Sequence, residues 1–275
     1  MARRTCLAAA LVALASLVVP SAPARSANFV PACTNPSFPG NAVAIDGRCG
    51  LEGSGGQEAE QDSVKNNFCA AGTPAVLSFG DFKQLQTSVE ANRAINFGDR
   101  DNPGAQGPTR DRAPLKALGE GKLVQVKAFV LTAHQEGPES VNCEHDFDHE
   151  PNEDLFHDIH ISLVETAQLA SPQNNTEEEA NECQGIVVEM SPHHRPPEWT
   201  ADNVKKVAAA HHPVRVTGQL FFDSSHVPCV GGREVRTNPR RISLWEVHSI
   251  YRFEICTADC DGAGTWVPLE QWVNR

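Results

Sequence analysis

Five segments in the second half of the chain alternate between apolar and polar residues, and this pattern restricts the fold more than any other feature. A period of two residues is typical of β-strands that bury one face. The sequence therefore predicts a mainly β domain over residues 121–256, in which the apolar faces of the strands share one core. The alternating segments are 123–133, 158–164, 185–190, 214–222 and 244–256.

One helix is predicted between the third and fourth of these strands. Thr200 is a suitable N-cap, the helix runs to about Ala210, and Pro213 ends it. This order of elements resembles the OB-fold, a five-stranded Greek-key barrel. The resemblance implies an OB-like barrel over residues 121–256, and an α+β sandwich with the same elements is the alternative.

The first residues have the pattern of a secretory signal peptide. Arg3 and Arg4 precede a short apolar run that ends at Pro20, and small residues follow. Residues 1–27 are therefore predicted to be cleaved during export. Spanning a bilayer takes about 20 apolar residues, and this run is shorter. No second apolar stretch of the sequence is long enough either, so we expect no membrane insertion after cleavage.

The regions on either side of the barrel segment differ from it in composition. Residues 28–120 are rich in turn-forming residues and contain one clear helical period, over 81–94. We expect a loop-rich, disulfide-stapled extension that packs on the barrel. Residues 257–275 are expected to form a tail that also packs on the barrel.

Cysteine usage agrees with export. The chain has nine cysteines, and removal of Cys6 with the signal peptide leaves an even number, as disulfides in an oxidising compartment require. The sequence leaves their pairing open. We expect a secreted or periplasmic protein with disulfides among Cys33, Cys49, Cys69, Cys143, Cys183, Cys229, Cys256 and Cys260.

The balance of charges limits the partners. The chain has 23 Lys and Arg against 35 Asp and Glu, a formal net charge of −12. Nucleic acids and anionic membranes repel such a chain, so broad binding to either is not expected.

Three short motifs resemble a family of exported bacterial proteins. The family combines a D-x-H strand with an FFD-x-x-H segment and a W-E-x-H segment. It has no assigned activity, so the resemblance implies an exported OB-like barrel and no particular chemistry. Ser249 stands where the family usually has proline. In this chain the motifs lie at residues 158–160, 221–226 and 245–248.

Histidine is concentrated in the barrel segment. All eleven histidines lie between residues 134 and 248. Polar residues that alternate with the core positions are predicted to face solvent, where imidazole and carboxylate groups suit a divalent transition metal or general acid–base chemistry. Ordinary solvent-facing polarity of a barrel is the alternative. The candidate ligand-binding residues are His160, Glu189, Asp223, His226, Glu246 and His248.

A second candidate site is the acidic segment between the first two strands. Residues 143–158 combine carboxylates with histidines, which suits a hard cation, zinc or copper. A solvated acidic loop is the alternative. The candidate metal ligands here are His145, Asp146, Asp148 and His149.

Two functions follow from these patterns. The first is an exported binding module whose ligand the sequence does not identify. The second is a metal-dependent hydrolase, acting for example on phosphodiesters, in which a divalent metal activates water. The sequence lacks a phosphate-binding glycine loop, HExxH and GxSxG, and it leaves open whether the protein is an enzyme. In the second function the metal ligands would come from His160, Glu189, His226, Glu246 and His248.

Overall fold

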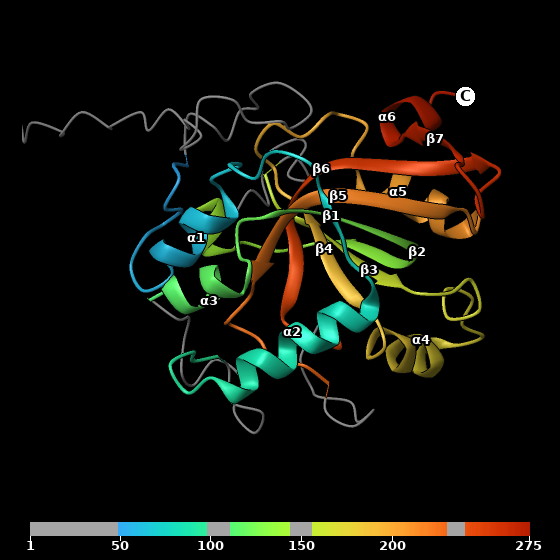
Figure 1. The fold of residues 1–275 in the computed structure, drawn as a ribbon. Helices are drawn as coiled ribbons and strands as arrows, with labels where there is room; N and C mark the ends of the chain where they lie inside the picture. The colour runs from blue at the N-terminus through green and yellow to red at the C-terminus, as the bar shows by residue number, and fades with distance from the viewer. Residues whose placement is uncertain (1–48, 98–110, 144–155, 230–239) are drawn as a thin grey trace, which may run out of the picture.

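The barrel predicted from the alternating segments is present in the computed structural model, which describes residues 49–97, 111–143, 156–229 and 240–275 (Figure 1). The sheet order is β2-β3-β4-β6-β5, and β5 pairs again with β2, so the five strands form a closed barrel. β4 and β6 run parallel, and the other barrel pairs run antiparallel. This confirms the predicted fold class, a mainly β barrel. The strands are β2 (Leu123–Gln135), β3 (Ile159–Val164), β4 (Ile186–Met190), β5 (Pro213–Phe222) and β6 (Trp245–Ala258).

The predicted helix between the third and fourth barrel strands is also present. Helix α5 (Ala201–Ala209) starts after Thr200, whose hydroxyl accepts a hydrogen bond from the Asn203 amide at 3.2 Å. Val204 and Val207 are both fully buried in the barrel core. The helix therefore forms because its N-cap and its apolar stripe agree with the position that the sheet leaves for it.

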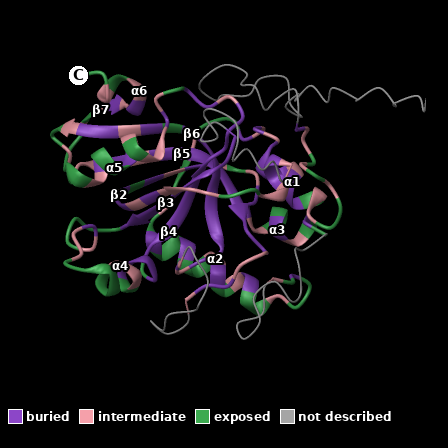
Figure 2. Cartoon of the chain, turned by 180° about the vertical axis from the view of Figure 1, so that it is seen from behind, coloured by how far each residue is buried: buried purple, intermediate pink, exposed green. Residues whose placement is uncertain are grey.

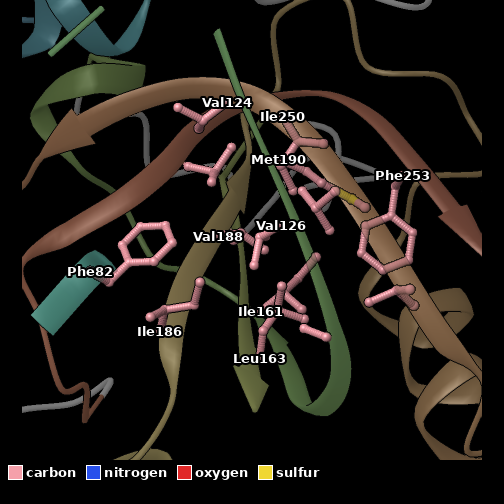
Figure 3. Packing of buried hydrophobic residues seen from close by; sticks show 14 of the residues in the cluster. Phe82, Val124, Val126, Ile161, Leu163, Ile186, Val188, Met190, Ile250 and Phe253 are labelled. Carbon is pink, nitrogen blue, oxygen red and sulfur yellow. The ribbon is translucent and has the colours of Figure 1, made fainter. Parts of the chain in front are cut away.

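The core lies inside the barrel and is closed by a helix from the N-terminal region. Figure 3 shows side chains such as Val126, Ile161 and Val188 converging in the space between the strands. Helix α2 (Phe79–Ala91) adds Phe82, which is fully buried in the same cluster. This helix coincides with the predicted helical period, and Ser78 and Asp81 form a capping box at its start.

The register of β6 changes near its middle, and one predicted core position is therefore wrong. The pairing with β5 shifts around Gly218, which lies opposite Ile250. A shift of one residue moves the next side chains to the other face. Alternation from Trp245 and Val247 predicts that Tyr251 faces inward. Instead Ile250 packs in the barrel core, and Tyr251 packs outside it against Phe68 and Ala70.

The N-terminal region lies against the outside of the barrel. It contains α1 (Ala59–Lys65), the short β1 (Ala75–Val76), which pairs with β2, and α3 (Ala113–Leu118). Both views of the chain place α1 and α3 side by side at one side of the barrel (Figures 1 and 2). The 3₁₀-turn η2 (Ser140–Asn142), between β2 and β3, packs against α1.

The C-terminal residues pack on the barrel. Strand β7 (Thr265–Pro268) pairs with β6, and helix α6 (Leu269–Trp272) buries Leu269 in the core. Between β3 and β4 the chain forms helix α4 (Asn175–Glu182). The Asn174 side chain caps that helix by accepting a hydrogen bond from the Glu177 amide at 3.0 Å.

Three disulfides connect the described residues. They are Cys49–Cys143, Cys183–Cys229 and Cys256–Cys260. Cys69 is also disulfide-bonded, and Cys33 lies outside the described residues. Such bonds persist in an oxidising, extracytoplasmic environment. Within the described ranges, none of the helices has the length and apolar character that crossing a bilayer requires. The predicted signal peptide, residues 1–27, lies outside the described residues.

Candidate metal centre

The six candidate ligand-binding residues lie close to the outer barrel wall, but most of them are not exposed. His160 keeps 3% of its surface accessible, Asp223 keeps 1%, and Glu189, Glu246 and His248 keep none. Only His226 is partly open, with 25% of its side chain exposed. The prediction that this face is turned to solvent is therefore wrong. The predicted alternation of the strands is correct, because the candidate residues on β3, β4 and β6 alternate with residues of the barrel core. The face that carries them is covered by another part of the chain.

That cover is made by α1 and η2, and buried hydrogen bonds hold it in place. The Gln219 amide nitrogen donates to the Val64 carbonyl at 2.6 Å, and the Ser249 hydroxyl donates to the Lys65 carbonyl at 3.0 Å. Asn66 donates to the Val141 carbonyl at 3.1 Å, which joins α1 to η2. The covered polar side chains are consequently withdrawn from water, and their charges interact strongly.

Three of the covered side chains meet at one point and form what we call the inner group, which consists of Asp158, Glu189 and His248. Glu189 of β4 and His248 of β6 are register partners in the parallel pair, and Asp158 immediately precedes β3. His248 Nε2 lies 2.9 Å from Glu189 Oε2 and 3.1 Å from Asp158 Oδ2. One ligand atom from each residue lies within 4.8 Å of the other two.

A second group of three lies next to the inner group, and His160 connects the two. This outer group consists of His134, Glu136 and His160, whose ligand atoms also lie within 4.8 Å of one another. Glu136 Oε1 lies 2.5 Å from His134 Nε2 and 2.8 Å from His160 Nδ1. The other ring nitrogen of His160, Nε2, lies 2.6 Å from Glu189 Oε1.

Only some of the short contacts within these groups are aligned hydrogen bonds, namely His248 with Asp158 and His134 with Glu136. Among the described residues, neither oxygen of Glu189 and neither ring nitrogen of His160 has an aligned hydrogen-bond partner, although all four atoms are buried. Asp158 Oδ1 is likewise buried and has no aligned hydrogen-bond partner among the described residues. Buried polar atoms are nearly always paired in folded proteins, so an unsatisfied set at one point calls for an explanation. Donor atoms that converge without aligned hydrogen bonds are what a bound cation would satisfy.

Electrostatics inside the cover favour an ion-paired centre. Burial alone would lower the pKa of His248, but the charge of Glu189 and the bond to Asp158 outweigh it and raise that pKa to about 10. Burial also opposes ionisation of Glu189, yet the positive charges of His160, Lys65 and His248 hold its pKa well below the usual range. Without a metal, protonated imidazoles therefore balance the inner carboxylates.

The remaining predicted residues form a separate ion-pair cluster. Arg241 Nη1 lies 2.7 Å from Glu246 Oε2 and 3.5 Å from Asp223 Oδ2. His226 Nδ1 lies 2.6 Å from the same Asp223 oxygen. Glu246 and Asp223 thus already face an arginine, and His226 faces Asp223, so these three side chains are not brought to the inner group.

Lys65, which the sequence analysis did not single out, lies between the two clusters. Its Nζ is 3.9 Å from Glu189 Oε2. Burial acts against its charge, but Glu189, Glu139, Asp223 and Glu246 together raise its pKa well above the usual value. Lys65 also lines a pocket of about 290 Å³. The other lining residues are Glu58, Gln61, Asp62, Glu139, Ser140, Val141, Asp223, Ser225 and His226.

The structure thus brings together His160, Glu189 and His248 from the predicted set and adds Asp158, Glu136 and His134. Asp158 had a signal in the sequence, the D-x-H motif that it shares with His160. Lys65 had none, because its role depends on a contact between α1 and strands more than a hundred residues away. The predicted metal ligands His145, Asp146, Asp148 and His149 all lie outside the described residues.

Comparison of the chain with protein families, with curated proteins and with solved structures finds no match. The chemistry of the site must therefore be argued from its own residues.

Proposed function

We propose that the protein is an exported, extracytoplasmic binding module with an OB-like barrel, and that its inner group binds a divalent transition-metal ion. The observation that carries the proposal is the convergence of Asp158, Glu189 and His248, whose carboxylate oxygens include three buried atoms without aligned hydrogen bonds. One imidazole and two carboxylates form a donor set that suits zinc or copper.

The distances fit such an ion after small movements. Two donors that each bind a tetrahedral ion at about 2.1 Å lie about 3.4 Å apart. His248 Nε2 is 2.9 Å and 3.1 Å from the two carboxylate oxygens, so the contacts open by about 0.5 Å and about 0.3 Å on binding. His160 Nε2 lies 2.6 Å from Glu189 Oε1, so this ring contacts a ligand of the inner group without being one of its three members.

The charges also fit. A metal-bound histidine is neutral, so binding releases the imidazole protons that otherwise balance Glu189 and Asp158. The cation then takes over that balance at the same place. Once the imidazoles are neutral, the carboxylates of Asp158, Glu189 and Asp223 face the two fixed cations Lys65 and Arg241, which leaves room for further positive charge. Burial raises the pKa of Glu139 and of Glu246 to about 8, so these two neighbouring carboxyl groups hold protons at neutral pH.

Zinc binding to the full chain tests the proposal. The protein is stripped with a chelator, incubated with Zn²⁺ and dialysed, and its zinc content and thermal midpoint are measured. A ligand present at 100 times its Kd stabilises the folded state by about 2.7 kcal/mol, so the wild-type midpoint rises. We expect His248→Ala to lose one bound ion and most of this rise, whereas His211→Ala, which changes an exposed histidine outside both groups, behaves like the wild type. Equal zinc content in His248→Ala and wild type refutes the proposal.

The pocket beside Lys65 favours a second candidate function, a metal-dependent hydrolase. It is adjacent to the inner group, since Lys65 lines it and also contacts Glu189. Glu139 lines the pocket as well, and burial raises the pKa of its carboxyl group to about 8, so it holds a proton that it could donate at neutral pH. A small activated phosphodiester, bis(p-nitrophenyl) phosphate, tests this function. Zinc-dependent hydrolysis that Glu139→Gln abolishes supports the hydrolase. Zinc binding without hydrolysis refutes the hydrolase and leaves metal binding as the function of the site.

A further inference from the structure

The outer group joins residues that neither the predicted constellation nor the inner group contains. His134 of β2 and His160 of β3 are register partners, so the pairing of the two strands fixes their spacing. Their rings meet edge to face, with centroids 5.5 Å apart. Glu136 follows β2, and its amide donates to the Asp158 carbonyl at 2.9 Å, which holds its backbone beside the start of β3. Three potential ligands are thus positioned by backbone hydrogen bonds rather than by a loop.

The contacts of Glu136 place a single carboxylate oxygen between two imidazoles. Oε1 lies 2.5 Å from His134 Nε2 and 2.8 Å from His160 Nδ1. His160 is buried, and its Nδ1 makes no aligned hydrogen bond among the described residues. This buried, unsatisfied nitrogen is directed at the outer group and is the observation that separates the group from an ordinary surface ion pair.

Accessibility changes steadily along this row of side chains. Glu189 is fully buried and His160 is 3% exposed, whereas the side chains of Glu136 and His134 are 24% and 35% exposed. An ion in the outer group would therefore be reached from solvent without moving the cover. It would also keep a coordination position for water, because the group supplies only three protein ligands.

We propose that His134, Glu136 and His160 form a second site for a divalent transition-metal ion, and that His160 binds this ion through Nδ1 while its Nε2 keeps a proton and faces Glu189 of the inner group. Two imidazoles and one carboxylate are a common donor set for zinc and copper. His160 faces the outer group through Nδ1 and Glu189 through Nε2, so one ring contacts both sites. The existence of the outer site does not depend on the proposed inner one, but the coupling of the two sites through His160 and Glu189 does.

Counting bound ions in single variants tests the outer site separately from the inner site. The full chain is loaded with Zn²⁺, dialysed and analysed for metal, with the thermal midpoint as a check on folding. We expect two ions in wild type, one in His134→Ala and one in His248→Ala. The control His211→Ala retains two. Because His134 is partly exposed, His134→Ala is compatible with the fold, and His134→Gln serves as a second variant that preserves more of the side-chain volume.

Cu²⁺ gives a readout of the ligands themselves. Electron paramagnetic resonance of the outer ion should show hyperfine coupling to two imidazole nitrogens in His248→Ala, in which only the outer site remains, and to one when His134→Ala is added. His160→Ala should weaken binding at both sites by at least tenfold.

The possible results separate the two proposals. If His134→Ala binds as many ions as wild type, the outer site is refuted while the inner site stands. If His134→Ala loses an ion and His248→Ala loses none, the outer site stands and the proposed function of the inner group fails. If His160→Ala affects the outer site only, the contact between His160 and Glu189 does not couple the two sites.

Discussion

The disulfide between Cys49 and Cys143 should contribute more to stability than any other that the described residues show. It ties the segment before α1 to the residue after η2, across a separation of 94 residues. A cross-link stabilises a protein largely by restricting the unfolded chain, and the effect grows with loop length. The loop-closure relation gives about 4.7 kcal/mol for this bond and about 2 kcal/mol for Cys256–Cys260, whose separation is 4 residues.

The comparison needs two double variants. In one, Cys49 and Cys143 are replaced by alanine, and in the other Cys256 and Cys260 are replaced in the same way. Urea unfolding at 25 °C, with the remaining disulfides verified by mass spectrometry, measures the free energy of unfolding of each. We expect the first variant to lose more than twice as much as the second.

A local effect should accompany the global one. The same bond holds η2 over the polar face, so the amides of residues 140–143 should exchange with solvent faster in the first variant. A smaller loss of stability in the Cys49/Cys143 variant than in the Cys256/Cys260 variant would refute the reasoning, since it would show that loop length does not determine the contribution.

Three further predictions concern single positions. Gly218→Ala should lower the free energy of unfolding by about 3 kcal/mol or more, because its Cβ would lie 2.4 Å from the Ser249 carbonyl oxygen, whereas Gly137→Ala, with nothing within 4 Å, should change thermal stability little. Burial raises the pKa of Asp62 to about 7, so its ionisation should lower the free energy of unfolding as the pH rises from about 4 to 7. Asp62→Asn should remove this pH dependence and stabilise the protein at pH 8 by up to about 4 kcal/mol in urea unfolding. A pH profile of stability identical to that of the wild type would contradict this. Ser78→Ala should cost about 1 kcal/mol by removing the cap of α2, and an unchanged thermal midpoint would count against the capping interaction.

Local patterns were sufficient to predict the barrel. Each strand carries its own alternation, and α5 carries its own cap in Thr200, so these elements could be located without knowledge of the rest of the chain. The pattern failed where a long-range contact overrides it. Tyr251 has the parity of a core residue, but the shifted pairing at Gly218 moves it to the outside.

The candidate site could be predicted only in part for the same reason. Strand parity correctly placed His160, Glu189 and His248 on the outer barrel face. Whether that face meets water depends on α1 and η2, and no local feature of either element shows that it covers a strand. The ion pair between Glu246 and Arg241 could not be predicted either, because Arg241 lies in a segment of the sequence without periodicity.

The parallel pairing of β4 with β6 has a consequence for biosynthesis. Glu189 is made long before its partner His248, because α5 and β5 separate the two in the chain. If the chain is exported and binds metal as we propose, a polypeptide that leaves a translocation pore amino terminus first would hold an incomplete set of ligands until its last barrel strand has emerged. The ion would then be acquired outside the cytoplasm, after translocation.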